Sequence, residues 1–183
     1  MITFGIDPGL DGAVARLEDG RLCARVMPTL DGHPDLADLN RFLVDDGRPE
    51  MVVIEKPEVR PGLSPTSILT IGQNHGRIVG LLVGLGIPYT EVQSKAWKKA
   101  MGLPSSSVSR GKDAPPEDAK QKSARLAKAR AERKDAAIAL AVQLYPSFDF
   151  RPSPRCKNRH DGMCEAALLA EYIRRVLCGQ VTR

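Results

Sequence analysis

The stretch "MITFGIDPGLDGAVARLEDG" (residues 1–20) decides the class of fold. Its apolar run ITFGID is typical of a buried strand, and the run ends at an acid, Asp7, that a Pro-Gly pair follows at once. GAVARLE and RLCARVM predict two more strands, joined at Asp19 and Gly20, a dipeptide that favours the positive φ angles of tight hairpins. The chain therefore begins with a three-stranded meander.

Helical and strand patterns alternate over the rest of the chain, which predicts a mixed α/β fold. A flexible loop rich in Ser, Pro and Gly interrupts this order over 104–116. The expected elements are a helix over 35–46 capped by Asp35, a short buried strand over 51–56, a helix over 66–85, a strand over 87–92, a helix near 94–103, a helix over 117–146 that is charged first and apolar from Ala136, and a closing helix over 161–177.

The composition is typical of one compact cytoplasmic domain. The chain has 183 residues, of which 42% are hydrophobic, enough to form one core. Four cysteines without a dense framework, and no charged-then-apolar leader, indicate a reducing compartment. No apolar stretch approaches the roughly 20 residues of a membrane span, so no membrane partner is expected.

Positive charge is concentrated in the middle of the chain. Residues 95–134 contain 12 Lys or Arg against 4 Asp or Glu, whereas residues 1–94 contain 8 against 13. Such a segment is either a solvated helix face or a surface that binds nucleic acid phosphates by releasing counterions. Aromatic residues make up only 4% of the chain, which disfavours recognition by a broad stacking platform.

The strand over 51–56 supplies a possible partner for Asp7, because it ends near Glu55. If the two strands are parallel neighbours joined by a crossover helix, their carboxyl ends lie about 5 Å apart. Two carboxylates that close repel each other unless a cation lies between them, and oxygen-only ligands suit Mg²⁺ or Mn²⁺. Acids at strand ends also serve as caps and turn residues, so this pair by itself leaves both interpretations open.

The closing helix contributes two further acids, Asp161 and Glu165, at positions i and i+4 on one face. A helix lying across the edge of the sheet would direct both acids at the same metal ions. The alternative is that Asp161 caps the helix and Glu165 is a surface acid. Glu165 stands in an otherwise apolar segment, where an unpaired charge is costly, and this favours the metal site.

Two further patterns have ordinary explanations. Gly72, Gly76, Gly80 and Gly84 recur every fourth residue of one predicted helix, which indicates close approach of another backbone. The expected neighbour is the sheet or a helix of the same chain, with a subunit contact as the alternative. The spacing Cys156-x₃-His160-x₃-Cys164 lacks a fourth zinc ligand, so Cys164 is expected in the core instead.

Six segments, in this order, resemble the RuvC-type Holliday junction resolvases, which have the ribonuclease H-like fold. The likeness spans nearly the whole chain. It is strongest to the branch found in phages, bacteria and chloroplasts, whose closing helix carries an acid-Gly-x-x-acid pattern, whereas the housekeeping bacterial enzyme has acids at i and i+3. The segments are GIDPGLDGA, VVIEKP, IGQNHGRIVGLL, KAWKKAMGL, KDAAIALAVQLYP and HDGMCEAALLAEY.

The resemblance implies a single nuclease domain over 1–183 with a flexible basic insertion around 104–117. Its fold would be a mixed five-stranded sheet, three strands antiparallel and the others parallel, flanked by helices. The protein would be a homodimer that cuts two opposed strands of a four-way DNA junction, in the cytoplasm of a bacterium or a phage-infected host. Two Mg²⁺ ions, for which Mn²⁺ can substitute, would be held by Asp7, Glu55, Asp161 and Glu165.

Five residues are expected to contact DNA. The resemblance favours Lys134, which opens the apolar half of the long helix, and Lys98 and Lys99 are further candidates for phosphate binding. Arg60 lies in the segment after Glu55, beside the expected metals. His160, next to Asp161, could orient a water or reach a phosphate, although a lone histidine more often has a structural role.

Other functions fit parts of the same pattern. A ribonuclease acting on RNA–DNA hybrids, or an exonuclease of the same fold, would share the four acids. A branched-DNA-binding protein without catalysis would have no metal at them. A sugar-kinase or actin-like ATPase also begins with a strand and an acid, but it needs two such domains, for which 183 residues are too few.

Overall fold

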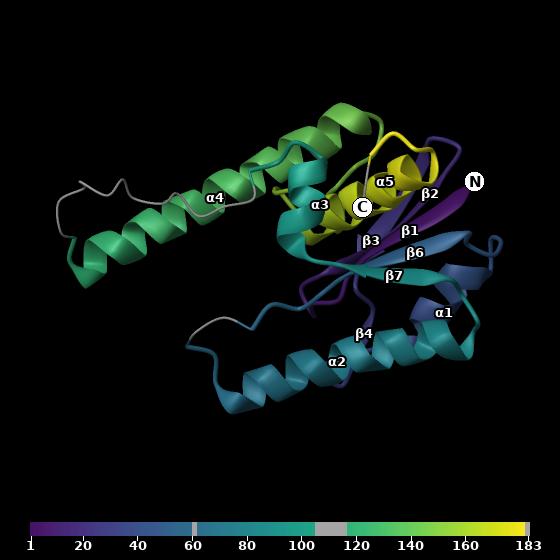
Figure 1. Cartoon of the computed structure of the whole chain (residues 1–183), viewed down its shortest axis with the longest axis horizontal. Helices are drawn as coiled ribbons and strands as arrows, with labels where there is room; N and C mark the ends of the chain where they lie inside the picture. Colours follow the sequence, from purple (N-terminus) through teal and green to yellow (C-terminus); the bar gives the residue numbers. More distant parts are fainter. Residues whose placement is uncertain (60–61, 105–116, 182–183) are drawn as a thin grey trace.

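The computed structural model describes residues 1–59, 62–104 and 117–181 and has a five-stranded sheet at its centre (Figure 1). The strands of this sheet are β1 (Ile2–Asp7), β2 (Ala13–Glu18), β3 (Arg21–Val26), β6 (Met51–Glu55) and β7 (Tyr89–Val92). The helices are α1 (Leu36–Val44), α2 (Pro65–Gly84), α3 (Ser94–Ala100), α4 (Ala119–Leu144) and α5 (Asp161–Leu177).

The strand order is β3-β2-β1-β6-β7, and the pairing confirms the predicted mixed sheet. β1 pairs antiparallel with β2, and β2 with β3, whereas β1 and β6, and β6 and β7, run parallel. The turn between β2 and β3 has positive φ at Asp19 (47°) and Gly20 (82°), as the dipeptide predicted. Every predicted helix and strand is present, with bounds within three residues of the expected ones.

One small element was not predicted. β4 (Thr29–Leu30) and β5 (His33–Pro34), strands of two residues each, form a small hairpin between β3 and α1. Its turn is a second Asp-Gly pair, Asp31 and Gly32, again with positive φ at both positions. The dipeptide was a readable signal, but the strands beside it are too short to give an alternating pattern.

Helices cover both faces of the sheet and bury a separate apolar core on each. α1 and α2 pack on one face, where Phe4, Ile6 and Ile54 are buried. α5, together with α3 and the apolar half of α4, packs on the other (Figure 1). α5 lies deepest, since nearly all of its residues from Gly162 to Ile173 are buried. Among the described residues, no helix has both the length and the apolar character to cross a bilayer.

The position of α5 depends on close approach to β1 at Gly5. A Cβ atom at Gly5 would lie 2.1 Å from the carbonyl oxygen of Ala166 and 2.5 Å from the backbone nitrogen of Ala170. The backbone of the helix therefore rests directly on the strand. The hydroxyl of Thr3, on the same strand face, donates a hydrogen bond to the Ala170 carbonyl (3.1 Å). This contact fixes where the first turns of α5 meet the end of β1.

The glycines of α2 have a different role from the one expected. Among the residues that the structure describes, a Cβ atom at Gly72, Gly76, Gly80 or Gly84 would meet nothing within 4 Å, so none of these glycines accommodates the sheet or another described helix. The expectation of a partner within the chain was wrong. α2 instead buries its opposite side, with Asn74, Ile78 and Leu82, and leaves the glycine side open.

Gly5→Ala should destabilise the protein by about 3 kcal/mol, because overpacking an interior forces the backbone to shift. Denaturant unfolding followed by circular dichroism measures this change in the free energy of unfolding. An unfolding free energy equal to that of the wild type would show that α5 does not rest on β1 at this residue.

Candidate active site

Asp7 and Glu55 are brought together by the parallel pairing of β1 and β6. The register aligns Ile6 with Ile54, so the next residue of each strand is one of the two acids. Alternation along β1 places Asp7 on the same face as Thr3 and Gly5, which is the face covered by α5. The two acids therefore lie side by side at the carboxyl edge of the sheet, beneath the start of α5.

The start of α5 brings the other two acids to this edge. Its N-cap is His160, whose Nδ1 accepts a hydrogen bond from the Met163 backbone nitrogen (3.2 Å). The alternative in which Asp161 caps the helix is therefore wrong, and Asp161 is the first helical residue. A Cβ atom at Gly162 would lie 2.9 Å from the Asp11 carbonyl oxygen, so this end of the helix also rests closely on the loop after β1.

The pKa values of the two strand acids indicate how crowded the negative charge is. Burial, together with the charges of Glu165 and Asp161, raises the pKa of Asp7 to about 6, although the Gly9 N–H and Lys98 act to lower it. Burial likewise raises the pKa of Glu55 to about 7. Lys98 and Trp97 lower the pKa of Glu55, whereas Glu165 and Asp7 raise it. The four acids thus share one electrostatic environment, and a cation there would favour their ionised forms.

Two lysines and a tryptophan bind three of these acids. Lys98 Nζ donates to Glu165 Oε1 at 2.8 Å, and Lys134 pairs with Asp161. Burial raises the pKa of Asp161, but the hydrogen bond and the charge of Lys134, with smaller contributions from the backbone and His160, together hold the pKa below its ordinary value. The indole N–H of Trp97 donates to Glu55 Oε2 at 2.6 Å, a charge-assisted bond from a fully buried ring. Each donor lies on a different element from the acid that it contacts.

The donor set fits a hard divalent cation, because all four candidate ligands are carboxylates. In the described part of the chain, no three Asp, Glu, His or Cys side chains are gathered closely enough to hold an ion. Asp161 and Glu165 are engaged by the lysine pairs, which supply the positive charge in this structure. Asp7, Glu55, Asp161 and Glu165 stay the predicted ligands, and holding an ion together would require Lys98 to release Glu165 and Lys134 to release Asp161.

The residues expected to contact DNA have different surroundings. Lys134 lies at the site and is 41% exposed, whereas Lys98 is only 18% exposed and faces Glu165. Lys99 is exposed at the end of α3. His160 has a structural role as the N-cap of α5. Arg60 lies outside the described residues, as does nearly all of the insertion expected around 104–117.

Trp97 is the site residue that the sequence interpretation missed. It was noted only as part of a predicted helix, and nothing in the pattern SKAWKKA indicates that the indole reaches a strand end 42 positions earlier. The one available signal was that Trp97 is the sole tryptophan of the chain. The zinc interpretation receives no support, because Cys164 is buried in the core and burial raises the pKa of its thiol to about 12.

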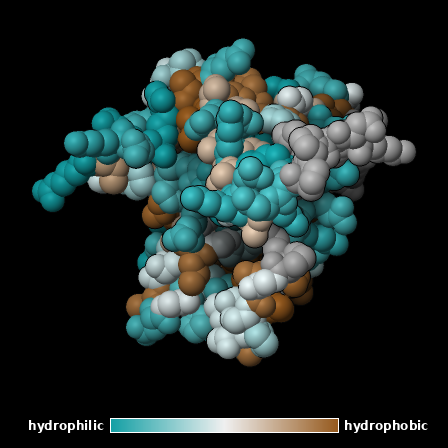
Figure 2. Space-filling model, turned by 90° about the vertical axis from the view of Figure 1, so that its left-hand side faces the viewer, coloured by the Kyte–Doolittle hydropathy of each residue, from teal (hydrophilic) through white to brown (hydrophobic). Residues whose placement is uncertain are grey.

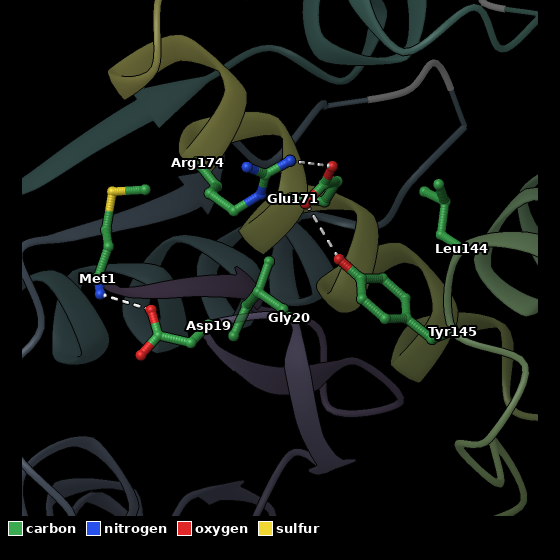
Figure 3. A pocket seen from close by; sticks show the side chains of 8 residues that line it. Met1, Asp19, Gly20, Leu144, Tyr145, Glu171 and Arg174 are labelled. Carbon is green, nitrogen blue, oxygen red and sulfur yellow. Dashed lines mark hydrogen bonds and ion pairs between the residues drawn. The ribbon is translucent and has the colours of Figure 1, made fainter.

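A pocket lies at the opposite end of β1 from Asp7 (Figure 3). It encloses about 360 Å³ between Met1, the turn at Asp19, and the ends of α4 and α5. Its buried acid, Glu171, accepts hydrogen bonds from Tyr145 (3.1 Å) and from two arginines, Arg174 and Arg175 (2.7 Å each). Burial raises the pKa of Glu171, but the arginines outweigh it and hold the pKa below its ordinary value. With its acid fully engaged, this pocket is a structural junction between α4 and α5.

Comparison with known proteins gives a match in structure alone. No family model matches the chain, and no curated protein matches its sequence. Among solved structures, RuvC of T. thermophilus in complex with a Holliday junction substrate aligns with a TM-score of 0.55 at 14% identity, covering 99% of this chain and 98% of that one. A second Thermus thermophilus RuvC structure aligns with a TM-score of 0.54 at 18% identity, with the same coverage. The chain therefore has the ribonuclease H-like fold found in RuvC.

Trp97→Phe should weaken binding of Mn²⁺ by roughly tenfold, because a partner that orients a ligand is typically worth 10- to 100-fold in metal affinity. Phenylalanine fills most of the indole volume but donates no hydrogen bond to Glu55. Titration calorimetry with Mn²⁺ measures the affinity. Phe4→Leu, in the core on the other face of the sheet, is the matched control and should lose core packing without losing metal affinity. Equal Mn²⁺ affinity in Trp97→Phe and the wild type would remove Trp97 from the site.

Proposed function

We propose that the protein is a Holliday junction resolvase, an endonuclease that cuts four-way DNA junctions symmetrically by hydrolysing phosphodiester bonds. The observation that carries this proposal is the convergence of two strand acids, Asp7 and Glu55, with Asp161 and Glu165 of α5 at one edge of the sheet. The similarity of fold to RuvC, solved with a Holliday junction substrate, supports the junction as the substrate.

The four carboxylates would hold two Mg²⁺ ions, for which Mn²⁺ can substitute. Bound there, divalent ions lower the pKa of the attacking water and neutralise charge on the scissile phosphate. The chain's own residues position this chemistry: Asp7 and Glu55 are fixed by strand pairing, Trp97 orients Glu55, and the start of α5 holds the other two acids. Lys134 is exposed enough to contact a DNA phosphate next to Asp161. Water attacks the phosphorus directly, so no covalent intermediate with the protein is needed.

Asp7→Asn and Glu55→Gln should each lower junction cleavage by about 10³-fold or more, because each change removes charge from the metal site while preserving its shape. Junction binding should persist, since neither change removes a positive group. Gel assays with labelled four-way junctions and Mg²⁺ measure both quantities. Asp149→Asn, which alters an exposed acid paired only with Arg151, is the control and should cut normally. Near-normal cleavage by both site variants would contradict the metal assignment.

The same substrates separate this proposal from its alternatives. Cutting of RNA–DNA hybrid or of duplex ends in preference to the junction would favour another nuclease of the same fold. Binding of branched DNA with no cleavage in Mg²⁺ or Mn²⁺ would favour a binding protein without catalysis.

The proposal includes a homodimer, because a four-way junction presents two equivalent strands about a two-fold axis and each chain has one carboxylate cluster. The open glycine side of α2 suits a second copy of this chain. Glycine costs about 0.5 to 1 kcal/mol per position within a helix relative to alanine, and no contact within the described chain offsets this cost. Leu69 and Val83, each 60% exposed, lie on the same helix, and Arg77 is its only Lys, Arg, Asp or Glu residue. A nearly neutral helix with small and apolar side chains can meet its own copy without charge repulsion.

Gly76→Arg should disrupt this dimer, because a long charged side chain prevents close approach of two α2 helices. Folding should be unaffected, since the position is open in the chain. Sedimentation measures the oligomeric state, and the junction assay should then show single nicks without paired cuts. Ala139→Arg, which adds the same charge at an exposed position of α4, is the control. A Gly76→Arg protein that stays dimeric would place the interface on another face.

A further inference from the structure

The N-terminal part of α4, residues 119–134, carries a strong positive charge; we call it the basic arm. It contains seven Lys or Arg and a single acid, Glu132. Its exposed lysines and arginine are Lys120, Lys122, Lys128 and Arg130. At 100° per residue these side chains point to different sides of the helix, so the basic arm has no single charged face opposite an apolar one.

The basic arm has its own local stabilisation. Asp118 caps the helix at Gln121 (2.7 Å), and the Gln121 side chain accepts from the Asp118 backbone nitrogen (3.0 Å), which completes a capping box. Arg125 also pairs with Glu117 (3.0 Å). Alanine, lysine and arginine are strong helix formers. The helix can therefore persist where the core does not support it.

The core receives apolar side chains of α4 only from Ala136 onward, as far as the described residues show. Ala129 is buried, but it belongs to neither apolar cluster. In Figure 1 the first half of α4 extends beyond the sheet, on the side of its carboxyl edge. Figure 2 faces this side and shows largely hydrophilic residues in the upper part, over α4, with more apolar ones below, over α2. The basic arm thus projects from the body of the protein.

The base of the basic arm lies at the acidic site. Lys134, its last residue, pairs with Asp161, the first residue of α5. Positive charge therefore extends from the carboxylates outward along the helix, with Glu132 as the one acid among residues 119–134. A duplex whose phosphate enters the site would have its neighbouring phosphates within the reach of this charge.

We propose that the basic arm binds the phosphate backbone of duplex DNA leading away from the cleavage site. The proposal rests on the function proposed above and adds a second, non-catalytic DNA contact to it. Sixteen helical residues span about 24 Å, which corresponds to roughly seven base pairs of duplex. A protein partner would need an apolar stripe, whereas Leu126 is the one large apolar side chain of the basic arm. Positive charge on several sides suits the polyanionic surface of DNA and carries no sequence preference.

Two double variants test the proposal, Lys120→Gln with Lys122→Gln and Lys128→Gln with Arg130→Gln. Glutamine preserves helix propensity, and neither variant alters Lys134 or the Arg125 pair. The two residues of each pair lie on opposite sides of the helix, so one duplex can contact only one of them. Each lost phosphate contact reduces the slope of log affinity against log salt by about 0.9, so each double variant should lower the slope by about 1. Arg21→Gln with Arg41→Gln removes two exposed positive charges elsewhere, and its slope should equal that of the wild type.

Fluorescence anisotropy with a labelled four-way junction and with plain duplex, at several salt concentrations, measures these slopes. Cleavage at saturating enzyme should be unchanged in the double variants, because none of the four substituted residues touches a reacting group. If wild type cuts junctions and both double variants keep its salt slope, the basic arm proposal is overturned and the resolvase function stands. If wild type does not prefer junctions but the double variants still lose slope on duplex, the basic arm binds DNA and the resolvase function fails.

Discussion

The close contact between α5 and β1 at Gly5 is the constraint on which the candidate site depends. Glycine leaves room for the backbone of the helix to rest on the strand, because a Cβ atom at Gly5 would lie only 2.1 Å from the carbonyl oxygen of Ala166. The first turn of α5 is thereby fixed over the end of β1, where Asp7 lies. A larger residue at this position would lift the helix and separate Asp161 and Glu165 from the two strand acids. The positions of the four acids therefore depend first on how the backbones of α5 and β1 pack.

Concentrated negative charge is the second feature that the fold has to accommodate. Burial and mutual repulsion raise the pKa of Asp7 to about 6 and of Glu55 to about 7. The structure offsets this charge with lysines on two neighbouring helices, Lys98 on α3 and Lys134 on α4. Trp97 adds a neutral donor to Glu55, which orients the carboxylate without adding charge. Divalent cations carry more charge than the lysines and can replace them as partners of the carboxylates, as the proposed chemistry requires.

The two longest helices differ in the surfaces they present. α2 has one charged residue, Arg77, and an open glycine side, which favours contact with the same helix of a second copy of the chain. The first half of α4 is basic and begins beyond the core, which favours a polyanion. Since both helices extend past the carboxyl edge of the sheet, the proposed dimer contact and the proposed DNA contact flank the acids on opposite sides (Figure 1).

The sequence by itself determined nearly all of the elements and the antiparallel meander at the start of the sheet, because hydrophobic period, Asp-Gly turns and caps such as Asp35 are local signals. Strand ends and i, i+4 spacing also suggested two pairs of acids, Asp7 with Glu55 and Asp161 with Glu165, and the resemblance to RuvC-type resolvases implied that they form one site. Only the tertiary structure decided what surrounds them. The bond from Trp97 to Glu55, the cap formed by His160 and the pairs of Lys98 and Lys134 join residues of different elements, and their distances depend on how helices pack. The glycines of α2 show the same limit: their spacing indicates a close contact, but only the packing of the chain reveals that its own elements leave that side open.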